Sequence, residues 1–310
     1  MGKAGGNVCA VIASAYACRD NVDGSSCECC RLYRGIRGMT RVESTEKTGS
    51  GLFLESLGVS SLAAVTVPFD PGYDFTTLDS HLEQSGHLMS MLKLSMACWL
   101  LADETTTRRK IAAARTRGVG VVSGGGPFEI AADCGRLSQY LDLCADLKFQ
   151  RVEAGEGFTE LRYSPSKVVR MAQERGLEVQ FEVGGKHDGP FTEASVSAHI
   201  LKGHEWLEAG AVEIVVEARE SAVDVALFDR TGALNSGLAD RFADELGLDH
   251  VLFEAPIKRS QFLLINHFGR EVRLGNIRLE EVLRVEIYRR GLHSDAFLQD
   301  NLRPTIRRVP

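Results

Sequence analysis

The sequence has no apolar run long enough to cross a membrane. Its longest hydrophobic stretches fall far short of the roughly 18 consecutive apolar residues that a membrane-spanning helix requires. It also has no excess of positive charge, because 42 Asp and Glu outnumber 36 Lys and Arg and give a net charge of −6. Non-specific binding of nucleic acid requires a basic face. We therefore expect neither a membrane nor a nucleic acid as a partner, and any anionic ligand requires a local cluster of Arg and Lys.

The cysteines do not show the two C-x-x-C pairs of a zinc site, because Cys27 and Cys30 form one such pair and no second pair follows. The densest group, CECC from Cys27 to Cys30, has no histidine before His81 to complete it, so no zinc site is predicted there. Later cysteines lie singly in apolar or helical contexts, namely Cys98, Cys134 and Cys144. Single buried thiols of this kind are typical of reduced cytoplasmic proteins, and we expect a cytoplasmic protein.

Residues 1–58 differ in composition from the rest of the chain. They are rich in Gly, Ser, Cys and charge, and they show no sustained hydrophobic period. We predict a poorly ordered extension, or a small appendage that does not share the core. Residues 59–310 are then the folded domain, and they are long enough to bury a substantial core.

From about residue 60, short apolar runs alternate with amphipathic segments. The predicted strands are SLAAVTVPF, MLKLS, VGVVSGGG, FQRVEAGEG, LEVQFEVGGK, AVEIVVEARES, HVLFEAP and EVRLGNI. Helical segments lie between them; one begins with Ser164 as N-cap and Pro165 in its first turn and ends at Gly176. Eight such units over roughly 250 residues favour a closed (β/α)8 TIM barrel, with an open doubly wound sheet as the alternative.

Charged residues follow the ends of most predicted strands. In a barrel these ends meet at one mouth, where function resides. The residues are Asp70, Lys93, Glu129, Glu153, Glu156, Glu182, Lys186, Glu217, Arg219, Glu220, Glu254 and Lys258, with Asn276 near the end of the last strand. The mixture suits a hard divalent cation held by carboxylates, with Arg and Lys receiving a phosphate or carboxylate. A structural ring of ion pairs at the end of the barrel would give the same pattern.

Two glycine-containing segments add candidate binding groups. In SGGGPFE, Gly124, Gly125 and Gly126 follow a strand, so their backbone N–H groups could face a phosphate. The segment has neither the spacing of a Rossmann fingerprint nor a P-loop lysine. Lys186 follows two glycines in EVGGK, which makes it a candidate proton donor or anion ligand, or else a solvated loop lysine.

Several of these stretches resemble the phosphosulfolactate synthase family. FEVGGK, VVEARES, LFEAPIKRSQ and LGNIRLEEVLRVEIYRRGLHSDAF are similar to matching stretches of that family, and VSGGGPFEIA and VEAGEG fit more loosely. The resemblance covers roughly residues 60–298. It implies a (β/α)8 barrel and a lyase that forms a carbon–sulfur bond by Mg²⁺-dependent addition of sulfite to phosphoenolpyruvate. The product, (2R)-phospho-3-sulfolactate, leads to coenzyme M in some organisms. Barrels of this kind often associate through outer helices, so a homo-oligomer is also expected.

The resemblance also implies roles for individual residues. Lys186 matches the family's lysine on the fifth strand and is assigned as the general acid, acting after sulfite addition builds a metal-stabilised enediolate. Glu217 and Arg219 are the other catalytic candidates. The metal candidates are Glu153, Glu182 and Glu217. The candidates for binding substrate and phosphate are Lys93, Gly124, Gly125, Gly126, Arg219, Lys258, Asn276 and Arg290.

Three loops in the first half of the barrel depart from the family pattern. Residues 70–72 read Asp-Pro-Gly where the family has Asp-Lys-Gly, and residues 155–157 read Gly-Glu-Gly where it commonly has Ser-Asp-Gly. KLSMACW keeps Lys93 but lacks the glycines of Lys-Phe-Gly-Trp-Gly. Two alternatives to sulfite addition therefore stay open. One is a related barrel enzyme that joins phosphoenolpyruvate or another phosphorylated acid to a different nucleophile. The other is a non-catalytic stress-associated barrel, because plant heat-stress-associated proteins resemble the same family.

Overall fold

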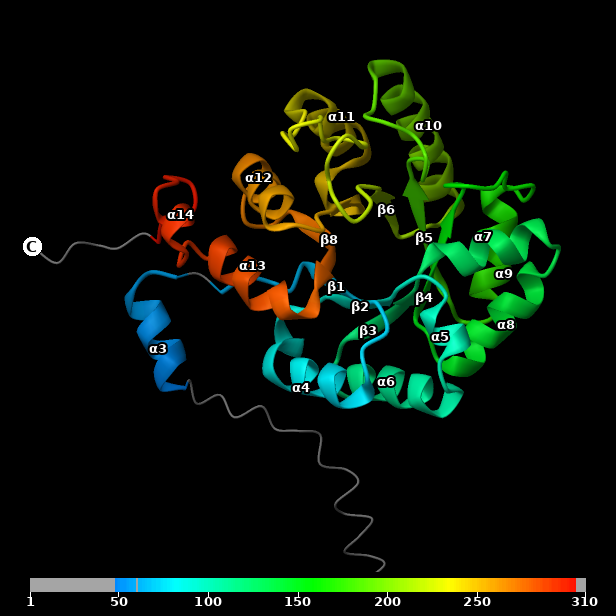
Figure 1. Cartoon of the computed structure of the whole chain (residues 1–310), viewed down its shortest axis with the longest axis horizontal. Helices are drawn as coiled ribbons and strands as arrows, with labels where there is room; N and C mark the ends of the chain where they lie inside the picture. Colours follow the sequence, from blue (N-terminus) through cyan, green and yellow to red (C-terminus); the bar gives the residue numbers. More distant parts are fainter. Residues whose placement is uncertain (1–47, 60, 305–310) are drawn as a thin grey trace, which may run out of the picture. The chain divides into compact units, whose positions relative to one another are not determined.

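Eight short apolar runs form a closed barrel of parallel strands in the computed structural model, which describes residues 48–59 and 61–304 (Figure 1). Each strand pairs with the next, and β1 pairs with β8 to close the ring. The strands are β1 (Thr66–Asp70), β2 (Met91–Leu94), β3 (Gly120–Ser123), β4 (Arg151–Gly155), β5 (Glu178–Val183), β6 (Glu213–Val216), β7 (Val251–Glu254) and β8 (Arg273–Arg278). The predicted (β/α)8 TIM barrel is confirmed, and the open sheet is excluded.

Helices connect the strands and lie outside the ring (Figure 1). The helices of the barrel are α4 (Phe75–Ser85), η1 (Gly86–Leu88), α5 (Cys98–Leu101), α6 (Glu104–Thr116), α7 (Gly125–Asp133), α8 (Leu137–Leu147), α9 (Pro165–Gln173), α10 (Glu193–Ala209), α11 (Ser236–Leu246), η2 (Leu248–His250), α12 (Lys258–Phe268), η3 (Leu279–Glu281), α13 (Val282–Arg289) and α14 (Ser294–Phe297). The predicted start of α9 is confirmed, because the Ser164 hydroxyl accepts a hydrogen bond from the Lys167 N–H and Pro165 occupies the first turn. None of the described helices is long and apolar enough to span a membrane.

The main core lies between the strands and the surrounding helices. Helix α8 buries one face, which is made of Leu137, Tyr140, Leu141, Cys144 and Leu147. Between β5 and α10, Phe181 stacks on Trp206, and the centroids of their aromatic rings are 4.3 Å apart. Fully burying side chains of this size stabilises the fold by about 1.5–3 kcal/mol each.

Replacement of Leu141 by alanine is expected to lower the free energy of unfolding by about 2–5 kcal/mol, because the fully buried side chain leaves a cavity. Urea denaturation followed by circular dichroism measures this change. Leu201 on α10 provides the control, because its side chain is 63% exposed, and Leu201→Ala should change stability by less than about 0.5 kcal/mol. Equal effects at both positions would contradict the described packing of α8.

The inside of the barrel is layered. Near the amino ends of the strands, Glu213 of β6 pairs with Arg273 at 2.6 Å and with Arg151 at 3.2 Å. A small apolar layer follows, made of Val67, Met91, Val122, Val215 and Leu252. Successive side chains of a strand point to opposite faces. Glu213 and Glu217 are four residues apart, so both point to the inside of the barrel. Glu213 therefore braces one end of the barrel, and Glu217 lies at the other.

Part of the predicted N-terminal extension has regular structure. Residues 49–56 form helix α3 (Gly49–Ser56), which buries no residue. Residues 1–47, with the cysteine cluster that begins at Cys27, lie outside the described residues. The proposed division of the chain near residue 58 therefore stays a prediction.

Candidate functional site

A cavity of about 630 Å³ opens at the carboxyl ends of the strands, and we call it the barrel mouth. Its lining includes one residue or more from every strand or the loop that follows it, for example Phe69, Ser95, Gly124, Glu153, Glu182, Glu217, Glu254 and Asn276. Enzymes with this fold hold their reactive groups at this end. The sequence therefore places its charged strand ends where such a site belongs.

Lys93 lies at the floor of the barrel mouth among carboxylates from three other strands. Its Nζ is 2.8 Å from Glu153 Oε1, 3.4 Å from Glu254 Oε1 and 3.9 Å from Glu182 Oε2. These residues come from β2, β4, β5 and β7, so their side chains meet across the inside of the ring. All four residues are buried. Lys93 therefore connects strands that are far apart in the sequence through buried ion pairs.

Lys186 forms a second bridge one level higher. It belongs to the loop after β5, where its N–H donates to the Gly157 carbonyl at 2.7 Å. Its ammonium group pairs with both Glu182 and Glu217, and its side chain is 23% exposed. Gly184 permits this approach, because its φ is +114° and a Cβ there would lie 2.9 Å from the Glu217 Cβ. Lys186 thus joins the buried carboxylates to the open cavity.

The electrostatics of this cluster are unbalanced. Four carboxylates, from Glu153, Glu182, Glu217 and Glu254, face only two ammonium groups. Burial raises the pKa of Glu182 to about 8 and raises the pKa of Glu254 well above its ordinary value. Burial also acts to raise the pKa of Glu217, but the attraction of Lys186 together with the hydrogen bonds that Glu217 makes lowers it to about 2. A divalent cation bound here would take the place of the protons that these raised pKa values retain on Glu182 and Glu254.

The two lysines are held in their charged form. Burial alone lowers the pKa of each, but the carboxylates outweigh it, with Glu153 the largest influence on Lys93 and Glu182 the largest on Lys186. The net result is a raised pKa for both. Each side chain therefore carries its proton at neutral pH.

Glu182, Glu217 and Glu254 form a possible metal site. One carboxylate oxygen from each residue lies within 4.8 Å of the other two, and all three residues are buried. Carboxylate oxygens are the hard ligands that Mg²⁺ and Ca²⁺ prefer, so the donor chemistry fits. We call these residues the carboxylate trio.

The trio differs from the predicted metal set in one member. Glu153 was expected as a ligand, but its oxygens accept hydrogen bonds from the Gly125 N–H at 2.9 Å and Gln180 Nε2 at 2.8 Å, and it pairs with Lys93. Glu254 takes its place in the trio. Glu254 was predicted to lie at a strand end but not to bind metal, although it ends an apolar strand in the same way as Glu217.

The predicted phosphate turn is the start of a helix. Gly124 is the N-cap of α7, its N–H donates to the Leu94 carbonyl at 2.9 Å, and the Gly125 N–H donates to Glu153. Two of the three glycine N–H groups are therefore already occupied, although all three glycines line the barrel mouth. Glycine disfavours a helix by about 1 kcal/mol per residue, so the local sequence did not predict α7. Burial of Phe128 and other apolar side chains stabilises this helix.

Among the other polar residues that line the barrel mouth, three are candidate ligands for an anion. Arg219 lines the cavity, its side chain is exposed, and its φ is +57°. Asn276 has a φ of +52° within β8, and its buried Oδ1 has no hydrogen-bond partner among the described residues. Arg278, at the end of β8, also lines the cavity and was not predicted. Unusual backbone angles at a cavity are typical of ligand sites.

Two predicted binding residues lie elsewhere. Lys258 does not line the barrel mouth; its Nζ lies 3.5 Å from Asp295 Oδ2, and both groups are about half exposed. Arg290 pairs with Glu286, whose other oxygen accepts a hydrogen bond from Thr66 at the amino end of β1. Helix α13 runs back along the barrel after β8, so its last turn reaches the end opposite the mouth. Arg290 therefore does not line the barrel mouth, and its predicted role in substrate binding stays a prediction.

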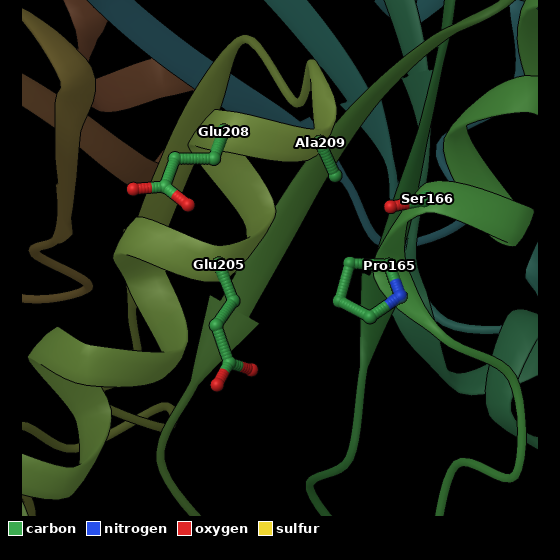
Figure 2. A pocket seen from close by; sticks show the side chains of 5 residues that line it. All are labelled: Pro165, Ser166, Glu205, Glu208 and Ala209. Carbon is green, nitrogen blue, oxygen red and sulfur yellow. The ribbon is translucent and has the colours of Figure 1, made fainter.

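A second hollow, of about 380 Å³, lies on the outside between the start of α9 and the end of α10. Figure 2 shows Glu205 and Glu208 on the α10 side and Pro165 and Ser166 on the α9 side. Its charged lining residues are both acidic, and an anionic substrate would be repelled. The barrel mouth is therefore the candidate active site.

The chain is similar to known proteins over the whole barrel. A family model described as (2R)-phospho-3-sulfolactate synthase matches residues 62–295, which include all eight strands. The phosphosulfolactate synthase of Methanocaldococcus jannaschii is 30% identical over 234 residues, which cover 75% of this chain and 93% of the relative. The protein of the same name from Methanothermobacter thermautotrophicus is 28% identical, covering 77% and 93%. That of Bacillus subtilis is 22% identical, covering 75% and 91%.

Proposed function

Because the chain belongs to the (2R)-phospho-3-sulfolactate synthase family, an enzyme family, we propose that it adds sulfite to phosphoenolpyruvate in a Mg²⁺-dependent reaction. The product is then (2R)-phospho-3-sulfolactate, and a carbon–sulfur bond is formed. The observation that carries the proposal is the contact of Lys186 with Glu182 and Glu217 of the carboxylate trio, at the edge of a cavity. This arrangement combines a proton donor with a site for a divalent cation.

The carboxylate trio would hold Mg²⁺. Its three oxygens are hard donors, they are buried, and the surrounding cluster has more carboxylates than cations. When bound, Mg²⁺ would act as a Lewis acid that stabilises negative charge on the substrate carboxylate. Lys93 fixes two of the three ligands, because its ammonium lies near Glu254 and Glu182. We assign Lys93 and Glu153 as positioning residues.

Lys186 is the proposed general acid. Sulfite forms a bond to the CH₂ carbon of phosphoenolpyruvate, and the electron pair of the double bond moves to the carbon that bears the phosphate. That carbon must then take a proton. Lys186 carries one at neutral pH because of its carboxylate partners, and its side chain extends from a glycine-containing loop into the lining of the cavity. Positioned acids of this kind typically contribute about 10²–10⁴-fold to the rate.

Arg219, Arg278 and Asn276 are the proposed phosphate ligands. Both guanidinium groups line the cavity, and Arg pairs well with phosphate oxygens. Asn276 has an unsatisfied amide oxygen, and the amide nitrogen can occupy the same place after a flip of the side chain. The amide could then donate a hydrogen bond to the substrate.

The proposal is tested by mixing purified protein with phosphoenolpyruvate, sulfite and Mg²⁺. Loss of the enol absorbance and mass spectrometry of the adduct report the reaction, and EDTA should stop it. A protein that shows Mg²⁺-dependent thermal stabilisation by phosphoenolpyruvate, but forms no sulfite adduct, would have another nucleophile. Absence of both adduct and stabilisation would favour the non-catalytic alternative.

A further inference from the structure

The lining of the barrel mouth has two unlike halves. Loops and strand ends from β5 to β8 contribute mainly charged and polar groups, including the carboxylate trio, Lys186, Arg219 and Arg278. Segments that follow β1 to β4, including helix α7, contribute an apolar half made of Pro71, Met96, Ala97, Pro127, Ile130 and Phe158. Only the floor of this half is charged, where Lys93 pairs with Glu153. A ligand that fills the cavity therefore meets charge on one side and hydrocarbon on the other.

The apolar half is exposed to the cavity and to solvent. Met96 is 55% exposed, Ile130 is 53% exposed and Phe158 is 45% exposed. Met96 also has a φ of +49°, which costs free energy in a residue other than glycine. Its loop passes so close to α7 that a Cβ on Gly124 would lie 2.7 Å from the Met96 nitrogen. The fold thus holds three apolar side chains at an opening where water would favour polar ones.

Small anions do not account for this half. Phosphoenolpyruvate and sulfite are compact and strongly anionic, and the apolar side chains offer neither a hydrogen-bond donor nor a positive charge. The cavity volume of about 630 Å³ lies within the roughly 300–1,000 Å³ typical of pockets for much larger ligands. A reaction partner with less charge and a hydrocarbon body matches the apolar half better.

We infer that the apolar half binds the hydrocarbon body of an organic thiol, which adds to phosphoenolpyruvate as a second class of sulfur nucleophile. This inference rests on the proposed function, because it uses the same phosphoenolpyruvate site and the same acid, Lys186. The thiol loses its proton to solvent, and its sulfur forms a bond to the CH₂ carbon. The double-bond electron pair moves to the phosphate-bearing carbon, which takes a proton from Lys186. The phosphate stays in place, nothing is oxidised or reduced, and Lys186 regains a proton from solvent.

The first test compares two thiols in the presence of phosphoenolpyruvate and Mg²⁺. Benzyl mercaptan has an apolar body, and 2-mercaptoethanol is a small polar thiol. We expect kcat/KM for benzyl mercaptan to be at least about tenfold higher, the scale of discrimination by an apolar pocket. Mass spectrometry should show the sum of phosphoenolpyruvate and thiol. Equal rates for the two thiols, or no thiol adduct, would overturn the inference.

The second test changes the apolar half. Ile130→Gln and Phe158→Ser should lower the ratio of kcat/KM for benzyl mercaptan to that for sulfite by about tenfold. Leu201→Gln is the matched control, because Leu201 is an exposed apolar residue on the outer helix α10, and this ratio should not change. An unchanged ratio in both mouth variants would also overturn the inference.

The two proposals fail in different ways. A sulfite adduct without a thiol adduct leaves the proposed function intact and overturns only the inference. A thiol adduct without a sulfite adduct supports the inference and removes sulfite from the proposed function. If phosphoenolpyruvate is consumed neither with sulfite nor with a thiol, both proposals are overturned.

Discussion

Lys186→Met is expected to lower kcat by about 10²–10⁴-fold, the contribution typical of a positioned acid. Methionine keeps the length and the apolar part of the side chain but cannot supply a proton. Phosphoenolpyruvate should still bind, because Arg219, Arg278 and Asn276 lie on β8 and after β6 rather than beside Lys186 in the chain. Stopped-flow or steady-state kinetics with sulfite measure kcat, and thermal stabilisation measures binding.

The control is Lys167→Met, on the exposed face of α9, which should change kcat by less than about twofold because surface substitutions away from special features have small effects. Turnover that persists in Lys186→Met would mean that another group donates the proton. Loss of phosphoenolpyruvate binding in the same variant would instead make Lys186 an anion ligand.

Glu254→Gln is expected to weaken Mg²⁺ binding more than Glu153→Gln does. Glu254 belongs to the carboxylate trio, so the change removes a charged ligand and leaves an amide of similar shape. Glu153 is linked to the trio through Lys93, and changes to groups that support a ligand typically cost about 10–100-fold in affinity. The loss at Glu254 should exceed that range.

Isothermal titration of the substrate-free protein with Mg²⁺ distinguishes the two variants without relying on activity. Removal of metal with EDTA should abolish turnover of the unmodified protein, and added Mg²⁺ should restore it. A larger loss of affinity in Glu153→Gln would return Glu153 to the ligand set and contradict the trio.

The order of elements was readable from the sequence because each strand and helix depends on local patterns. Runs of β-branched residues indicate strands, and the Ser164 cap indicates where a helix begins. The regular spacing of apolar residues in α8 indicates a helix, and packing then stabilises these elements. Helix α7 was missed because its glycines oppose a helix locally and its stability comes from burial of Phe128. A signal that depends on tertiary contacts does not appear in a local pattern.

The site was predictable as a region but not as a set of contacts. Strand-end carboxylates had to converge once the ring closed, and this placed Glu182, Glu217 and Lys186 together. Which carboxylate lies nearest to them depends on how side chains cross the barrel, and Glu254 has an oxygen within 4.8 Å of oxygens from Glu182 and Glu217. The position of Arg290 near Glu286 and Thr66 was not predictable, because similarity to a family stretch does not say toward which end of the barrel a helix turn points.

The bridge from Lys186 to Glu182 and Glu217 has a consequence for assembly of the protein. A buried group of carboxylates without positive charge would repel itself and oppose folding. Lys93 and Lys186 offset half of that charge within the chain, so the barrel can reach its native state before any ion arrives. Metal binding then follows folding as a separate step. A chelator should abolish the activity of the enzyme without unfolding it.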